Sequence, residues 1–198
     1  MATFAELNAD VMTLTNRPDL VNETSLAVRA ATLKAHHKDF YFKDLYEISL
    51  AWSDPAFIQS LDYRLLIPRW RQFKYLRKYD NSVSPGVPGA FFTMLTPEQV
   101  LDRYEIQKDN VCYMAGTQLE IRSNTEDDNM LLGCYLHPDT NPASYNSWIA
   151  LDHPWIIVFE AAKIIFKTIG KDEENAAYTK ELAELYQALN GEITGKGE

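Results

Sequence analysis

Cysteines and long apolar runs are scarce in this sequence, and each scarcity excludes a class of protein. Only Cys112 and Cys134 occur among the 198 residues, too few for a small fold held together by disulfides. Both lie in apolar segments with strand character, so we expect buried free thiols and no catalytic thiolate, because burial disfavours the charged form. The most apolar segment, 155–166, is interrupted by Glu160 and Lys163, and no membrane-spanning helix is predicted.

Positive charge is also scarce, and the N-terminus has no secretion signal. The 19 basic residues are outnumbered by 28 acidic ones, which gives a formal net charge of −9 and disfavours general nucleic-acid binding. Glu6 and Asp10 stand where a signal peptide has basic and then apolar residues. We therefore expect a protein that stays in the compartment where it is made.

No motif predicts an enzyme, a metal site or a cofactor. A glycine-rich phosphate loop, a nucleophile elbow and a dinucleotide fingerprint are all missing from the sequence. His36 and His37 are adjacent and point about 100° apart on a helix, so we interpret them as helix-end cations. The acidic loop of Glu126, Asp127 and Asp128 lacks the spacing and glycine of a calcium loop, and a solvated hairpin tip is the default interpretation.

Apolar residues at helical spacing predict helices near the N-terminus. Thr3 and Glu6 have the spacing of a capping box at the start of a short helix. Asn16 is interpreted as the N-cap of a second helix, which ends at the basic run 36–38.

The C-terminal third is also predicted to be helical. Residues 148–168 form one dense apolar helix that Gly170 stops. Residues 172–189 carry an apolar stripe and form its antiparallel partner, which Gly191 closes.

Alternating residues predict strands in the middle of the chain. Residues 46–52 have period two, and 57–63 is interpreted as a second strand paired with them, although a helix starting at Asp54 is an alternative. Residues 81–89 indicate an exposed loop, and 96–104 a short capped helix. A meander of three short strands then covers 111–114, 118–122 and 130–137.

One basic and aromatic segment, 64–78, stands out in this acidic chain. Trp70, Phe73 and Leu76 lie three residues apart, which predicts a helix beginning near Pro68. A protein interface, a single-stranded nucleic-acid site and a plain solvated helix face all fit this composition. The net charge of −9 favours the protein interface over nucleic acid. The residues assigned to this interface are Arg64, Arg69, Trp70, Arg71, Lys74, Arg77 and Lys78.

Several segments spread over most of the chain carry a resemblance. They are LTNRPDLV at 14–21, ATLKAH at 31–36, IQSLDY at 58–63, IPRWR at 67–71, KYLR at 74–77, YMAG at 113–116, LEIRS at 119–123, SWIA at 147–150, EAA at 160–162 and FKTIG at 166–170. In their residues and in their order along the chain, these segments resemble tailed-bacteriophage adaptor proteins. Such proteins form the head-tail connector in the neck between the capsid portal and the tail. Such motifs concern fold and packing, so no catalytic residue carries over.

The resemblance implies an α+β, mainly helical fold: a helical adaptor domain with inserted short antiparallel β-strands. One domain would span 1–198, with helical parts at 1–38 and 145–191, a β-containing insertion at about 40–138 and a flexible tail at 192–198. The resemblance also implies a structural virion protein rather than an enzyme, forming a ring, typically of twelve copies. Its partners would be the portal protein, tail or nozzle proteins, and double-stranded DNA that passes through the lumen without specific binding.

A ring requires a head-to-tail contact between two different faces of the subunit. The basic segment 64–78 could meet either the acidic loop Glu126, Asp127 and Asp128 or the acidic helix start at 172–174. Two alternatives from other classes remain at this point: a nucleic-acid-binding module that uses the basic segment, and a small enzyme without a recognisable motif.

Overall fold

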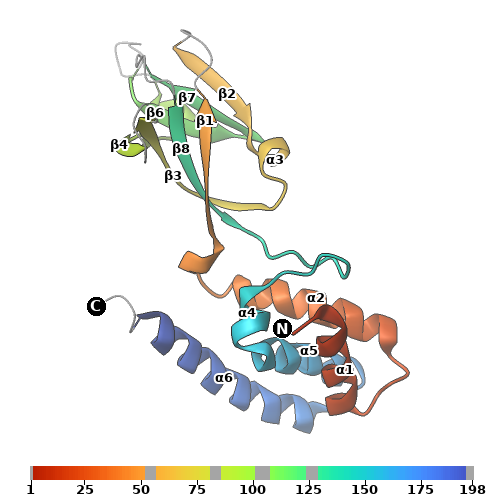
Figure 1. Cartoon of the computed structure of the whole chain (residues 1–198). Helices are drawn as coiled ribbons and strands as arrows, with labels where there is room; N and C mark the ends of the chain where they lie inside the picture. Colours follow the sequence, from red (N-terminus) through yellow and green to blue (C-terminus); the bar gives the residue numbers. More distant parts are fainter. Residues whose placement is uncertain (1, 52–56, 81–85, 101–107, 124–128, 195–198) are drawn as a thin grey trace. The chain divides into compact units, whose positions relative to one another are not determined.

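The computed structural model describes residues 2–51, 57–80, 86–100, 108–123 and 129–194. The chain divides into two compact units, both visible in Figure 1. The helical unit comprises residues 1–43 and 138–198, and the β unit comprises residues 44–137. Each unit has a hydrophobic cluster of its own. The two ends of the chain therefore build one core together, and the middle of the chain builds the other.

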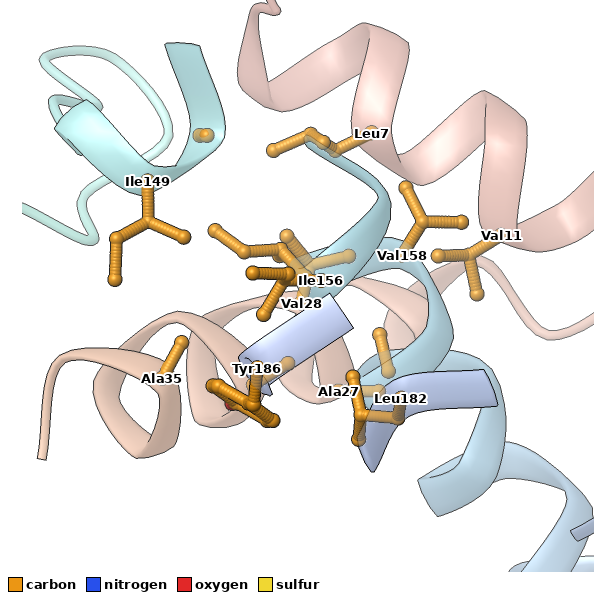
Figure 2. Packing of buried hydrophobic residues seen from close by; sticks show 14 of the residues in the cluster. Leu7, Val11, Ala27, Val28, Ala35, Ile149, Ile156, Val158, Leu182 and Tyr186 are labelled. Carbon is orange, nitrogen blue, oxygen red and sulfur yellow. The ribbon is translucent and has the colours of Figure 1, made fainter. Parts of the chain in front are cut away.

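The helices of the helical unit are α1 (Phe4–Thr15), α2 (Val21–His36), α4 (Trp148–Asp152), α5 (Pro154–Thr168) and α6 (Asp172–Thr194). The predicted capping box starts α1: the backbone N–H of Glu6 donates to Thr3 Oγ1 at 3.2 Å, and the backbone N–H of Thr3 donates to Glu6 Oε2 at 2.7 Å. Figure 2 shows how α1, α2, α5 and α6 send apolar side chains into one cluster, among them Val11, Val28 and Leu182.

The predicted start of the second helix is wrong. Asn16 ends α1 instead, with a left-handed φ of 51°, which asparagine tolerates better than most residues. Asp19, in the turn between α1 and α2, pairs with Arg17 at 2.7 Å. The basic helix end is confirmed, because His36 is the last residue of α2.

The predicted single helix over 148–168 is broken into α4 and α5. His153 separates them with φ −138° and ψ 59°, because Pro154 has no N–H to donate and disfavours helical backbone in the residue before it. Gly170 ends α5 as predicted, with φ 73°. After Gly170 the chain turns into α6, which continues past Gly191 to Thr194, so 192–194 belong to a helix and not to a loose tail.

The β unit follows the 3₁₀ turn η1 (Phe42–Asp44). In order its elements are β1 (Leu45–Ala51), β2 (Ile58–Asp62), α3 (Tyr63–Leu66), β3 (Trp70–Asp80), β4 (Val87–Phe91), β5 (Thr93–Met94), the 3₁₀ turn η2 (Pro97–Gln99), β6 (Val111–Ala115), β7 (Gln118–Arg122) and β8 (Asn129–Leu136). The described residues form two four-stranded sheets, ordered β1-β8-β3-β4 and β2-β7-β6-β5. All neighbouring strands are antiparallel except β5 and β6.

These sheets correct the expected fold class. The chain is 46% helix and 30% strand, a mixed α/β fold with two multi-stranded sheets. A mainly helical domain with a few inserted strands is therefore wrong. The largest single error is the segment 64–78, which forms the one-turn helix α3 and the long strand β3 in place of the predicted helix.

Two β-bulges explain why β3 has helix-like spacing. The register with β8 shifts between Trp70 and Gln72 and again between Phe73 and Tyr75. Each shift adds a residue to β3, so residues three apart on β3 oppose residues two apart on β8. Trp70, Phe73 and Leu76 thus all face the β-unit core, and their partners are Leu136, Cys134 and Leu132.

Pairing between strands also differs from the prediction. The strand over 46–52 is confirmed as β1 up to Ala51, but β2 pairs with β7 and not with β1. The first two strands of the meander pair as β6 and β7, whereas β8 lies between β1 and β3 in the other sheet. Part of the predicted loop at 81–89 is the edge strand β4, where Pro88 is tolerated because it needs no donor on the outer side.

Three predictions concern segments that lie partly or wholly outside the described residues. The start of the alternative helix at Asp54 lies outside the described residues, but Ile58–Asp62 forms the strand β2, so this alternative is wrong. The acidic residues Glu126, Asp127 and Asp128 lie outside the described residues. The predicted helix at 96–104 is the 3₁₀ turn η2, capped by Thr96 and Gln99, up to the described limit at Val100.

Candidate protein-interaction face

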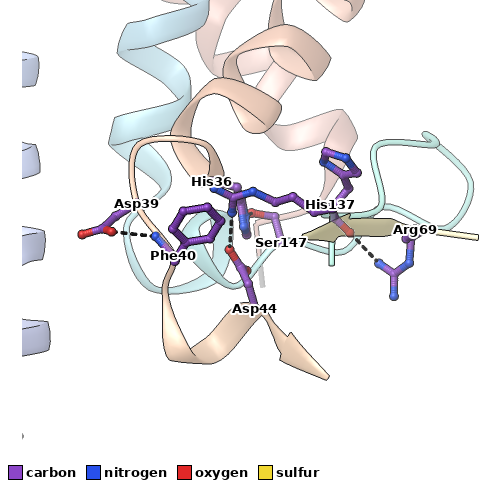
Figure 3. A network of polar contacts seen from close by, with 8 residues as sticks. His36, Asp39, Phe40, Asp44, Arg69, His137 and Ser147 are labelled. Atoms are coloured by element: carbon purple, nitrogen blue, oxygen red, sulfur yellow. Dashed lines mark hydrogen bonds and ion pairs between the residues drawn. The ribbon is translucent and has the colours of Figure 1, made fainter. Parts of the chain in front are cut away.

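The basic residues of 64–78, which are predicted to form one interface, lie in different surroundings in the structure. Arg64 is exposed on α3, and Arg69 is exposed just before β3, where one of its guanidinium N–H groups donates to the backbone oxygen of His137 at 3.4 Å (Figure 3). Trp70 packs into the β-unit core, with its ring 4.5 Å from that of Tyr63. The segment therefore does not present one continuous basic face.

Arg71 is committed to an ion pair inside the β unit. Its guanidinium lies 3.5 Å from the Asp44 carboxylate, and the two side chains are only 9% and 5% exposed. A buried charge needs such a partner to offset its lost hydration. Arg71 thus links the start of β3 to the start of β1 and is removed from the predicted interface.

Arg77 lies on the outer face of the first sheet, opposite the β-unit core. Leu76 points into the core, so its neighbours Tyr75 and Arg77 point outward, and Phe91 opposes Arg77 on the neighbouring strand. The guanidinium carbon of Arg77 is 5.4 Å from the Tyr75 ring centroid and 5.6 Å from the Phe91 ring centroid. The two rings meet edge to face at 5.7 Å. We call Tyr75, Arg77 and Phe91 the Arg77 cluster.

A glycine on the central strand positions this cluster. Gly133 is the register partner of Tyr75, and a Cβ atom on Gly133 would lie 2.6 Å from Tyr75 Cζ. The Tyr75 ring therefore covers the space that the glycine leaves open, as aromatic residues do over sheet glycines. Beside it, Lys74 Nζ lies 5.6 Å from the ring centroid of Tyr135. Lys78 alternates to the other side of β3 and opposes Met130.

The Arg77 cluster has the chemistry of an interface anchor. Phe91 is 62% exposed, and Arg77 Nε is buried without a hydrogen-bond partner in the described part of the chain. An arginine held between aromatic rings can bind a carboxylate with a fixed fork geometry, and such residues dominate the binding energy of protein interfaces. Phe91 is not among the predicted interface residues, because strand pairing and not sequence spacing brings it to Arg77.

The described acidic surface is on α6. Asp172 and Glu173 are exposed at its start, and Glu174 pairs with Lys171 at 3.3 Å. The pKa of the Glu174 carboxyl is lowered by backbone hydrogen bonding at the helix start and by Lys171. Further along, Glu181 and Glu184 are exposed. Among the described residues, helix α6 therefore carries negative charge that complements the positive charge of the Arg77 cluster.

His36, the last residue of α2, is buried and packs against neighbouring side chains. His36 is 1% exposed, and its Nε2 lies 2.9 Å from Oγ of Ser147, which Figure 3 shows beside it. The His36 ring meets the Trp148 ring edge to face. In the described residues no group of three His, Cys, Asp or Glu side chains could hold a metal ion.

Both cysteines are free, buried thiols, as predicted. Burial raises the pKa of Cys112 to about 12 and that of Cys134 to about 11. A thiol that stays protonated near neutral pH is a poor nucleophile. No helix among the described residues is long and apolar enough to cross a membrane.

In comparisons with known proteins, no family model and no curated protein matches this chain. The resemblance to phage adaptor proteins therefore stays a prediction.

Proposed function

We propose that this chain is a structural virion protein, the subunit of a ring that connects the capsid portal to the tail and lines the DNA channel. The resemblance of segments across the chain suggests this role. The structure supports it through two surfaces of opposite character, the Arg77 cluster on the β unit and the acidic helix α6 on the helical unit. A closed ring needs two such different faces on every subunit.

The observation that carries the proposal is the Arg77 cluster, which lies on the side of the first sheet away from the β-unit core and includes the exposed Phe91. Phe91 is 62% exposed, and its ring centroid lies 5.6 Å from the guanidinium carbon of the half-buried Arg77. In an acidic chain, an acidic protein surface, including another copy, fits this cluster better than nucleic acid does. The net charge of −9 also suits a channel wall that repels phosphate, so that DNA moves past without binding.

The test is the mass of the purified chain by light scattering, first alone and then mixed with a portal ring from the same virus. We expect a stoichiometric complex with the portal ring. Arg77→Glu should weaken assembly at least about tenfold, because it reverses the charge at an interface anchor. Arg29→Glu makes the same charge change at an exposed arginine of α2 and should have little effect.

Two results would overturn the proposal. One is a chain that stays monomeric and ignores the portal ring at every concentration tested. The other is a chain that binds single-stranded nucleic acid with an affinity that falls steeply as salt rises, which is typical of a nucleic-acid-binding module. The basic residues of 64–78 are divided between buried and exposed positions, which argues against the second result.

A further inference from the structure

An apolar groove lies on the surface of the helical unit. Its volume is about 510 Å³, and its apolar lining is Leu14 of α1, Trp155 and Phe159 of α5, and Tyr178 and Leu185 of α6. Trp155 is 52% exposed, and the Trp155 and Phe159 rings lie 5.6 Å apart. An open, aromatic-lined groove of this kind is the usual receptor for an apolar anchor from another protein.

One carboxylate, Glu181, belongs to the lining of this groove. It is exposed and follows Tyr178 by three residues on α6. The pKa of the Tyr178 hydroxyl is raised by burial and by the nearby Glu181 charge. The groove therefore favours an apolar side chain that has a cation beside it.

The β unit carries a tip with this chemistry. Leu65 is 82% exposed, the highest value among the exposed large apolar side chains. It lies in the one-turn helix α3, directly after the exposed Arg64. The tip is held in shape, because Asp62 Oδ1 accepts hydrogen bonds from the backbone N–H groups of Arg64 and Leu65 at 3.0 and 3.1 Å.

The base of the tip is anchored in the β-unit core. Tyr63, the first residue of α3, is 6% exposed, and its hydroxyl donates to the backbone oxygen of Gly116 at 3.0 Å. A tip that is ordered before binding loses little conformational entropy when it docks. A flexible loop would lose more.

We infer that the tip of one copy docks in the groove of a neighbouring copy, with Leu65 against Trp155 and Leu185 and with Arg64 beside Glu181. The contact is head to tail, since the tip and the groove lie on different units of the chain. It rests on the proposed function in one respect, because it names one of the contacts between ring subunits.

Two other strongly exposed apolar residues, Phe42 and Leu26, fit the groove less well. Phe42 is 75% exposed, but its neighbouring cation Lys43 is already paired with Asp152 at 2.5 Å. Leu26 is 62% exposed on the 16-residue helix α2, whose long flat face cannot enter a short groove. Leu65 combines high exposure with an adjacent arginine, Arg64, whose side chain has no partner among the described residues.

Disulfide trapping tests this contact in the full-length chain. One preparation carries Leu65→Cys and the other Leu185→Cys, and the two are mixed under mild oxidation, with and without the portal ring. We expect at least about tenfold more of the mixed disulfide dimer than with Leu26→Cys in place of Leu65→Cys, because docking raises the effective concentration of the two thiols. The native thiols should contribute little, because Cys112 and Cys134 are buried.

A charge swap tests the role of the arginine. Adding Arg64→Glu to the tip preparation should lower the yield about twofold to fivefold, as expected for an exposed ion pair. Adding Glu181→Arg to the groove preparation should then restore it. Arg29→Glu in the tip preparation is the control and should leave the yield unchanged.

The outcomes separate this contact from the proposed function. A yield no higher than that of the Leu26→Cys control, both free and on the portal ring, overturns the inferred contact even if the chain binds the portal. Failure of the swap to restore the yield removes Arg64 and Glu181 from the contact. Efficient trapping by a chain that ignores the portal would keep the contact and overturn the connector role.

Discussion

The helical unit and the β unit build their cores in different ways. In the helical unit, residues a few positions apart on one helix face the core together, as Ala27, Val28 and Ala31 do on α2. In the β unit the central strand β8 pairs with β1 and β3, which precede it by tens of residues. The side of a helix that faces the core is therefore encoded locally, whereas the pairing of strands in a sheet depends on contacts between distant segments. This difference explains where sequence patterns succeed and where they fail.

The largest expected effect comes from opening a cavity in either core. Leu132 of β8 and Ile157 of α5 are both 0% exposed. Leu132→Ala and Ile157→Ala should each lower the free energy of unfolding by about 2–5 kcal/mol. Hydrogen exchange should show the loss of protection in the β unit for the first variant and in the helical unit for the second. Equal loss in both units for either variant would mean that the two cores do not fold as separate units.

A second test places a methyl group under Tyr75. Gly133→Ala puts a Cβ atom 2.6 Å from the Tyr75 ring and should cost about 1–3 kcal/mol of unfolding free energy in chemical denaturation. Gly191→Ala is the matched control in the helical unit, because a Cβ there meets nothing within 4 Å. Removing a glycine from a helix should be neutral or stabilising. If Tyr75→Ala fails to relieve the Gly133→Ala defect, the ring is not the obstacle.

Sequence patterns predicted the helical unit better than the β unit. The capping box at Thr3 and the stop at Gly170 are local signals, and both are confirmed. Asn16 was assigned to the wrong helix end, because asparagine suits both an N-cap and a left-handed C-terminal position. The break at His153 was missed although Pro154 follows it, since the apolar run around it dominated the pattern.

In the β unit, strands were found more readily than their partners. Residues 45–51 alternate and form β1, but nothing local shows that β8 lies beside them. The helix predicted for the segment 64–78 is wrong for the same reason, because bulges give β3 the spacing of a helix. Strand pairing, which no local pattern shows, brings Phe91 to Arg77. Charge alone marked the segment, but it did not reveal that Arg71 is buried against Asp44.

A pH series extends the comparison, because both cysteines lie in the β unit. Thiols of an unfolded chain ionise near pH 8.5, whereas burial raises the pKa of Cys112 to about 12. The unfolded state therefore loses protons first, so stability is complete below pH 8.5 and falls as the pH rises towards 12. The wild type should lose about 2 kcal/mol more unfolding free energy than Cys112→Ala between pH 8 and pH 10. A parallel loss in both proteins would show that this thiol already ionises in the folded state.

The smallest expected effect is at the first helix of the chain. Thr3→Ala removes the hydroxyl that accepts from the Glu6 N–H and should cost about 0.5–1 kcal/mol in chemical denaturation. Thr3→Ser keeps an acceptor at the same place and should restore most of this loss. Because the capping box contacts only α1, the change should weaken exchange protection at the start of α1 and leave that of β8 unchanged. A loss of protection in β8 would mean that even this local signal acts across both units, and the contrast between local and distant encoding would fail at its simplest element.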